Sequence, residues 1–128
     1  MLTIHYNPSN TKLWSIKDIR DLVQSKFGKC ACWFQVKVAQ ALHAGKDVVA
    51  CAPTGAGKTL SFWIPLLMAL EEGQDKMSIV VTPLNLLGQQ NKTSLDKAGL
   101  PAIAVNKDNA NSETWKVIFS RPDIIDFH

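Results

Sequence analysis

The sequence predicts an α/β domain in which helices cover both faces of a parallel sheet. Three short apolar runs have the length and composition of buried strands, and they alternate with longer stretches in which apolar residues recur at helical spacing. Strands that alternate with helices are joined by right-handed crossovers, which make the sheet parallel. A length of 128 residues with 46% hydrophobic residues suits one domain, or part of one, with a buried core.

Local start and stop signals place the elements. Ser15 followed by Asp18 resembles a capping box, and Gly28 is a natural residue just after a helix, so the first helix lies between them. Pro65 lacks the N–H of the helical ladder and is expected to kink or divide its helix. The prediction is helix 16–27, helix 34 or 35–44, strand 47–51, helix 57–70, strand 78–81, helix 84–98, strand 101–105 and a candidate fourth strand at 115–119.

Composition and charge limit the classes of protein to which this chain can belong. Fourteen Lys and Arg against eleven Asp and Glu give a net charge of +3, which is compatible with a nucleic-acid partner. The longest apolar stretch, 60–70, is far shorter than the roughly 20 residues that cross a bilayer, so no membrane association is expected. The first 14 residues do not resemble a secretory signal, and a nuclear or cytoplasmic protein is expected.

The cysteines favour free thiols. Cys30, Cys32 and Cys51 are an odd number in a chain without an export signal, which argues against a disulfide framework. Cys30 and Cys32 could begin a zinc site, but no second pair of Cys or His follows at ligand spacing. We therefore expect no zinc site.

The most specific functional motif in the sequence is residues 52–59, Ala-Pro-Thr-Gly-Ala-Gly-Lys-Thr. They follow a predicted strand and open a helix, as a phosphate-binding P-loop requires, although a glycine-rich turn with a solvated lysine is the bland alternative. The two glycines let successive N–H groups point inward, and the helix N-terminus attracts anions. Lys58 and Thr59 are the predicted catalytic residues, Lys58 reaching the β- and γ-phosphates and Thr59 ligating Mg²⁺. The predicted nucleotide contacts are Gln35, Pro53, Thr54, Gly55, Ala56, Gly57, Lys58, Thr59 and Leu60.

The predicted nucleotide is ATP. Residues 106–109 nearly match an N-K-x-D motif, but Asn109 stands where guanine recognition needs Asp. Gln35 lies 23 residues before Lys58, and its amide offers one donor and one acceptor that match the N6/N7 edge of adenine. A polar residue at a helix N-terminus is the structural alternative for Gln35.

Together these features resemble superfamily 2 helicases, in which a glutamine in that place reads adenine and the P-loop has the form A-x-x-G-x-G-K-T. Within that superfamily the chain is most similar to RecQ-like DNA helicases. Residues 22–35 resemble their motif 0, 59–66 the helix after their P-loop, 80–84 their motif Ia and 120–124 their motif Ib. A DEAD-box RNA helicase would have Arg in motif Ia where this chain has Leu84.

The resemblance implies a partial RecA-like domain over 15–128, preceded by an N-terminal extension over 1–14 and truncated before the Walker B box. It implies ATP and Mg²⁺ as cofactors, single-stranded or forked DNA as partner, and 3′-to-5′ unwinding in DNA repair or recombination as the activity. The 128 residues alone are expected to be inactive. Two alternatives stay open, a DEAD/DEAH-box RNA helicase fragment and a non-catalytic module that binds ATP and nucleic acid. The implied nucleic-acid contacts are Thr82, Pro83, Asn85, Ser120 and Arg121.

Overall fold

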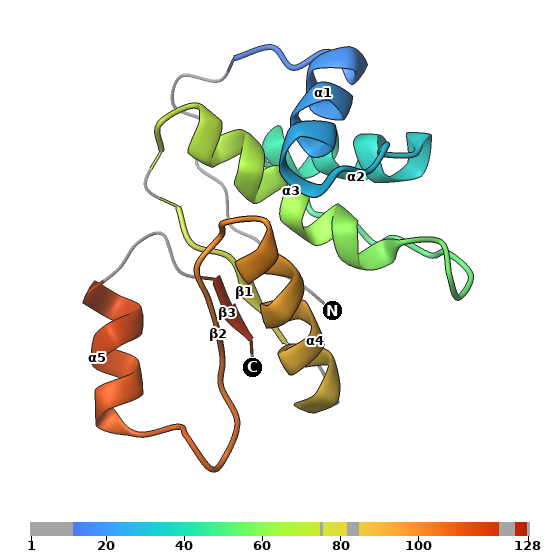
Figure 1. Ribbon diagram of the computed structural model, residues 1–128. Helices are drawn as coiled ribbons and strands as arrows, with labels where there is room; N and C mark the ends of the chain where they lie inside the picture. The colour runs from blue at the N-terminus through green and yellow to red at the C-terminus, as the bar shows by residue number, and fades with distance from the viewer. Residues whose placement is uncertain (1–11, 75, 82–84, 121–124, 128) are drawn as a thin grey trace. The chain divides into compact units, whose positions relative to one another are not determined.

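The computed structural model of this chain describes residues 12–74, 76–81, 85–120 and 125–127. The chain divides into two compact units, Thr3–Gln74 and Asp75–His128. Among the described residues the first unit contains helices α1 to α3, and the second contains a small sheet with helices α4 and α5 (Figure 1). The predicted P-loop lies in the first unit.

Helix α1 (Ile16–Phe27) has the bounds that the sequence predicts. The Ser15 hydroxyl accepts from the Asp18 N–H at 3.1 Å, and the Asp18 carboxylate accepts from the Ser15 N–H at 3.1 Å, which completes the capping box. The pKa of the Asp18 carboxyl is lowered because hydrogen bonds from Ser15, first from its side chain and then from its backbone, favour the ionised carboxylate. Gly28 ends the helix with a φ of 63°, in the left-handed region that favours glycine.

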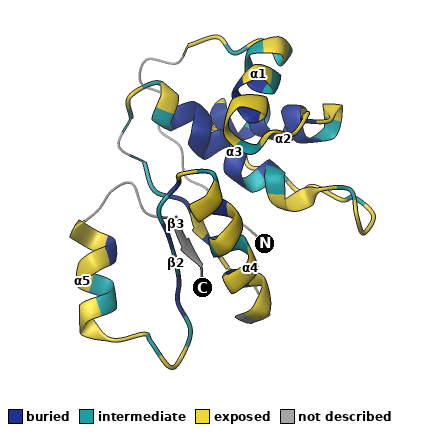
Figure 2. Cartoon of the chain, in the orientation of Figure 1, coloured by how far each residue is buried: buried dark blue, intermediate teal, exposed yellow. Residues whose placement is uncertain are grey.

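The core of the first unit lies between α2 (Trp33–His43) and α3 (Lys58–Glu71). Many residues of these two helices are buried (Figure 2). Pro65 does not divide α3, because it lies within a buried apolar stretch whose packing outweighs the missing backbone hydrogen bond. The largest fully buried apolar side chains of the two helices are Val36, Ile64, Leu67 and Met68.

The second unit contains a parallel sheet of three short strands, in the order β1-β3-β2. β1 (Ile79–Val80) and β2 (Ala102–Ala104) confirm the strands predicted at 78–81 and 101–105. β3 (Ile125–Phe127) lies between them in parallel register with both and was not predicted. α4 (Asn85–Lys97) connects β1 to β2 and packs against β2, as expected for a crossover. That helices cover both faces stays a prediction.

Two predicted strands are wrong. Residues 47–51 form no strand, and Val49 is 87% exposed. A strand exists only where a neighbour pairs its backbone groups, and in the described part of the chain the ladders join β1, β3 and β2 alone.

Residues 115–119 belong instead to helix α5 (Ser112–Ser120). The Asn111 side chain accepts from the Thr114 N–H at 2.9 Å, which is the geometry of a helix N-cap. One helical turn then brings the rings of Trp115 and Phe119 into a stack, with centroids 6.2 Å apart. Their aromatic character, typical of strands, is overridden by this cap.

Some general expectations concern the whole chain. Cys30, Cys32 and Cys51 are free and exposed. Within the described ranges, no helix has the length and apolar character needed to cross a bilayer. Over the same ranges, no three His, Cys, Asp or Glu side chains form a group that could hold a metal ion.

Candidate nucleotide-binding site

The predicted P-loop forms an exposed turn that leads into α3. Gly55 and Gly57 have φ angles of 83° and 72°, and both therefore use backbone conformations that side chains disfavour. The Ala56 N–H donates to the Pro53 carbonyl at 3.2 Å and closes the turn. Gly57 is the N-cap of α3. The glycines of the sequence motif are therefore required by the backbone that they form.

Lys58 and Thr59 are the first two residues of α3, and both are exposed. The Lys58 ammonium donates to the carbonyls of Ala52 at 2.8 Å and Pro53 at 3.0 Å, so it lies over the start of the loop. The first N–H groups of a helix have no intrahelical partner and carry its positive end. A cation and a helix N-terminus therefore meet at the loop and can bind phosphate oxygens. The Thr59 hydroxyl is an oxygen ligand of the kind that Mg²⁺ takes.

Gln35 connects the second helix of the unit to this loop. Its Oε1 accepts from the Cys32 N–H at 2.9 Å, and its Nε2 donates to the Gly57 carbonyl at 2.8 Å. The residue is only 6% exposed. Each amide atom keeps one further hydrogen-bonding position, because Nε2 has a second proton and Oε1 a second lone pair. The structural role at a helix N-terminus is therefore present, while adenine recognition stays a prediction.

Gln35 packs closely against Gly57. A Cβ atom at this position would lie 2.5 Å from Gln35 Nε2, which is too close for any real contact. By contrast, a Cβ at Gly55 would meet nothing within 4 Å. Gly57 is therefore needed twice, once for its backbone conformation and once for the approach of Gln35.

The implied nucleic-acid residues belong to the second unit. Thr82, Pro83 and Arg121 lie outside the described residues, and Asn85 is the first residue of α4. Ser120 ends α5, and its hydroxyl donates to the Val117 carbonyl at 3.0 Å. The contacts implied for these five residues stay predictions.

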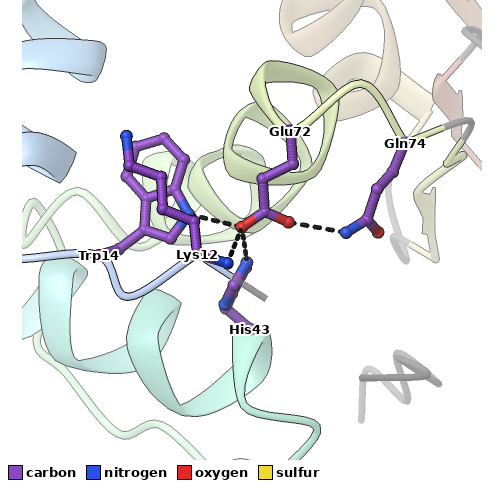
Figure 3. A network of polar contacts seen from close by, with 5 residues as sticks. All are labelled: Lys12, Trp14, His43, Glu72 and Gln74. Atoms are coloured by element: carbon purple, nitrogen blue, oxygen red, sulfur yellow. Dashed lines mark hydrogen bonds and ion pairs between the residues drawn. The ribbon is translucent and has the colours of Figure 1, made fainter. Parts of the chain in front are cut away.

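Sequence reasoning missed a polar cluster at the other end of α3 (Figure 3). Glu72, the C-cap of this helix, receives hydrogen bonds from both sides of its carboxylate. The only sequence signal is the glutamate itself, because a negative side chain at a helix C-terminus opposes the helix dipole and needs compensation. Its partners are the Lys12 backbone N–H at 3.2 Å, Trp14 Nε1 at 2.8 Å, His43 Nε2 at 3.0 Å and Gln74 Nε2 at 2.7 Å.

A glycine turn of this conformation, followed by a helix that begins with Lys-Thr, defines the class of P-loop nucleotide-binding proteins. The family described as DEAD/DEAH box helicase matches residues 33–125. The chain belongs to the DEAD/DEAH box helicase family, whose members use ATP, typically with Mg²⁺.

Curated relatives carry the names of RNA helicases. "ATP-dependent RNA helicase ROK1" of Scheffersomyces stipitis is 44% identical over 54 residues, which cover 37% of this chain and 10% of that protein. "Probable ATP-dependent RNA helicase ddx52" of Dictyostelium discoideum is 45% identical over 58 residues, which cover 44% and 9%. The matched region thus spans about a tenth of the length of these relatives.

A solved structure shares the fold. The chain resembles a structure described as "DUF1998 helicase MrfA bound to DNA and AMPPNP", with a TM-score of 0.65 and 17% identity over 86% of this chain and 16% of that one. The match to the DEAD/DEAH box helicase family over residues 33–125 confirms the helicase prediction. The finer prediction of a RecQ-like DNA helicase with a role in DNA repair is not supported, and the names of the curated relatives favour the RNA-helicase alternative.

Proposed function

We propose that this chain supplies the ATP-binding part of an ATP-dependent RNA helicase. The observation that carries the proposal is the phosphate cradle, in which two glycines with positive φ lead into a helix that begins with Lys58 and Thr59. RNA is preferred as the nucleic-acid class because the curated relatives ROK1 and ddx52 are named RNA helicases.

In this proposal each residue of the cradle has a chemical role. Lys58 neutralises charge on the β- and γ-phosphates, and the free N–H groups at the start of α3 bind their oxygens. Thr59 ligates the Mg²⁺ ion that ATP brings. Gln35 uses its remaining proton and lone pair to read the adenine edge, which gives ATP an advantage over GTP.

The deciding experiment is calorimetric titration of the 128-residue chain with ATP and Mg²⁺. Lys58→Ala should weaken binding about tenfold to a hundredfold, because a charge-assisted contact of about 1.5–3 kcal/mol is lost. Lys46→Ala is the matched control, since Lys46 is an exposed lysine of the same unit outside the cradle, and it should bind ATP like the parent. Equal affinity in Lys58→Ala and the parent would remove the P-loop assignment.

DNA is the second candidate substrate, and the sequence gives a specific reason for it. Leu84 follows Thr82-Pro83 where a DEAD-box RNA helicase has Arg. Binding of RNA and DNA single strands of the same base sequence at low salt distinguishes the two. Affinity should be weak and should fall with salt, because a chain of net charge +3 neutralises few phosphates. Tighter binding of DNA would favour the second candidate.

A further inference from the structure

The Glu72 cluster (Figure 3) lies at the C-terminal ends of α2 and α3, and the cradle lies at the N-terminus of α3. His43 is the last residue of α2 and Glu72 is the C-cap of α3, so their contact joins the C-terminal ends of the two helices. At the other end of the same helices, Gln35 near the start of α2 donates to Gly57, the N-cap of α3. Polar side chains of α2 therefore contact α3 at both of its ends.

The segment before α1 closes this far-end contact. The Trp14 indole N–H and the Lys12 backbone N–H both donate to the oxygen that His43 contacts. The Trp14 ring lies edge-on to the His43 ring, with centroids 6.4 Å apart, and the Lys12 ammonium lies 4.4 Å from the Trp14 centroid. Both residues precede position 33, where the family match begins.

Stability alone is a poor explanation for such a pair. The side chains of His43 and Glu72 are each 7% exposed. Taking a carboxylate out of water is costly, and well-packed apolar side chains often serve stability equally well. The best-attested benefit of a buried polar contact is to fix one register between packed elements.

The lengths of the helices show which movement is restrained. From Gln35 to His43, α2 rises about 12 Å, while α3 rises about 22 Å from Gly57 to Glu72. The side chains at the two ends and the angle between the helices together take up the difference. A slide of α2 along α3 that shortens the contact at one end therefore stretches the contact at the other.

We infer that Glu72, together with His43 and Trp14, positions Gln35 at the proposed nucleotide site. The cluster fixes the C-terminal ends of α2 and α3, and this holds the Gln35 amide on the Gly57 carbonyl. Loss of the Glu72 cluster lets α2 shift. This shift moves the base-reading glutamine but leaves the cradle on α3 intact. This inference rests on the proposed ATP site.

The first test needs no nucleotide. A double-mutant cycle between Glu72→Met and Gln35→Ala, measured by urea unfolding of the 128-residue chain, should be sub-additive, because releasing one end already relieves the other. Sites this far apart normally add, so the coupling is diagnostic. The control is Asp21→Asn, which breaks an exposed ion pair with Lys17 on α1 and should add to Glu72→Met. Additive behaviour of Glu72→Met and Gln35→Ala would overturn the inference.

The second test compares the affinities of ATP, GTP and inorganic tripolyphosphate in variants shown to be folded by circular dichroism. Glu72→Met should lower the ATP-over-GTP ratio severalfold, toward that of Gln35→Ala, with tripolyphosphate affinity within about twofold of the parent. Glu72→Gln keeps an acceptor oxygen for Trp14 and His43 and should restore the ratio.

The two proposals fail in different ways. A parent that shows no preference for ATP would remove the base-reading role of Gln35 from the proposed function, and the unfolding cycle would still decide the role of Glu72. A ratio that falls in Gln35→Ala but not in Glu72→Met would overturn the positioning role while leaving the ATP site in place.

Discussion

Replacing Gly57 by alanine tests how the cradle is built. Alanine in the left-handed region costs about 1–2 kcal/mol, and Gly57 has a φ of 72°. The new Cβ would also lie 2.5 Å from Gln35 Nε2, so the glutamine must move away and lose its hydrogen bond to the Gly57 carbonyl. Loss of that bond costs about 0.5–1.5 kcal/mol. The expected destabilisation is therefore about 1.5–3.5 kcal/mol.

Gly55→Ala is the matched control for this substitution. Gly55 has a φ of 83°, but its Cβ would meet nothing within 4 Å, so only the backbone strain applies. Urea unfolding followed by circular dichroism and tryptophan fluorescence measures both variants in the same chain. The excess cost of Gly57→Ala over Gly55→Ala then isolates the contact with Gln35.

A third variant provides the critical check. In a Gln35→Ala background the side chain that clashes is absent, so Gly57→Ala should cost no more than Gly55→Ala does in the parent. If Gly57→Ala is equally costly with and without the Gln35 side chain, the close packing of α2 against the loop is refuted. The same result would weaken every argument that places Gln35 at the nucleotide.

Two further predictions concern the capping box and catalysis. The lowered pKa of Asp18 means that its capping interaction stabilises the fold above the pKa of the unfolded carboxyl and is lost as pH falls through the folded pKa. Urea midpoints measured downward from about pH 5 should therefore fall less steeply in Ser15→Ala than in the parent, and parallel profiles would contradict this. The 128-residue chain should release no phosphate from ATP above background, with or without nucleic acid, because it contains no D-E-x-H or D-E-A-D box. Stimulated turnover that Lys58→Ala abolishes would show that a catalytic carboxylate was overlooked.

The sequence predicts best those elements whose signals are local. The bounds of α1 follow from Ser15, Asp18 and Gly28, because caps act within one turn of the helix end. The turn and helix of the P-loop are equally local, since the glycines, Lys58 and Thr59 are consecutive. Strands depend on neighbours elsewhere in the chain, and this is why 47–51 was wrongly predicted and β3 was missed.

The candidate site shows the same limit. The octet at 52–59 identifies the cradle, and Gln35 was singled out by its spacing from Lys58. Spacing could not reveal that the glutamine is bonded to the Gly57 carbonyl, a contact 22 residues apart in the chain. The Glu72 cluster was still less accessible, because its donors come from the segment before α1, from α2 and from the turn after α3.

The two ends of α3 favour groups of opposite charge. Its N-terminus carries the positive end of the helix dipole and an exposed lysine, so it attracts anions. Its C-terminus carries the negative end, where the Glu72 carboxylate is unfavourable unless donors surround it. His43 of α2 supplies one of these donors, just as Gln35 of α2 contacts the helix at its start. Because α2 contributes a polar contact at each end, we expect the position of Gln35 to depend on a carboxylate that lies about 22 Å of helix away from the P-loop turn.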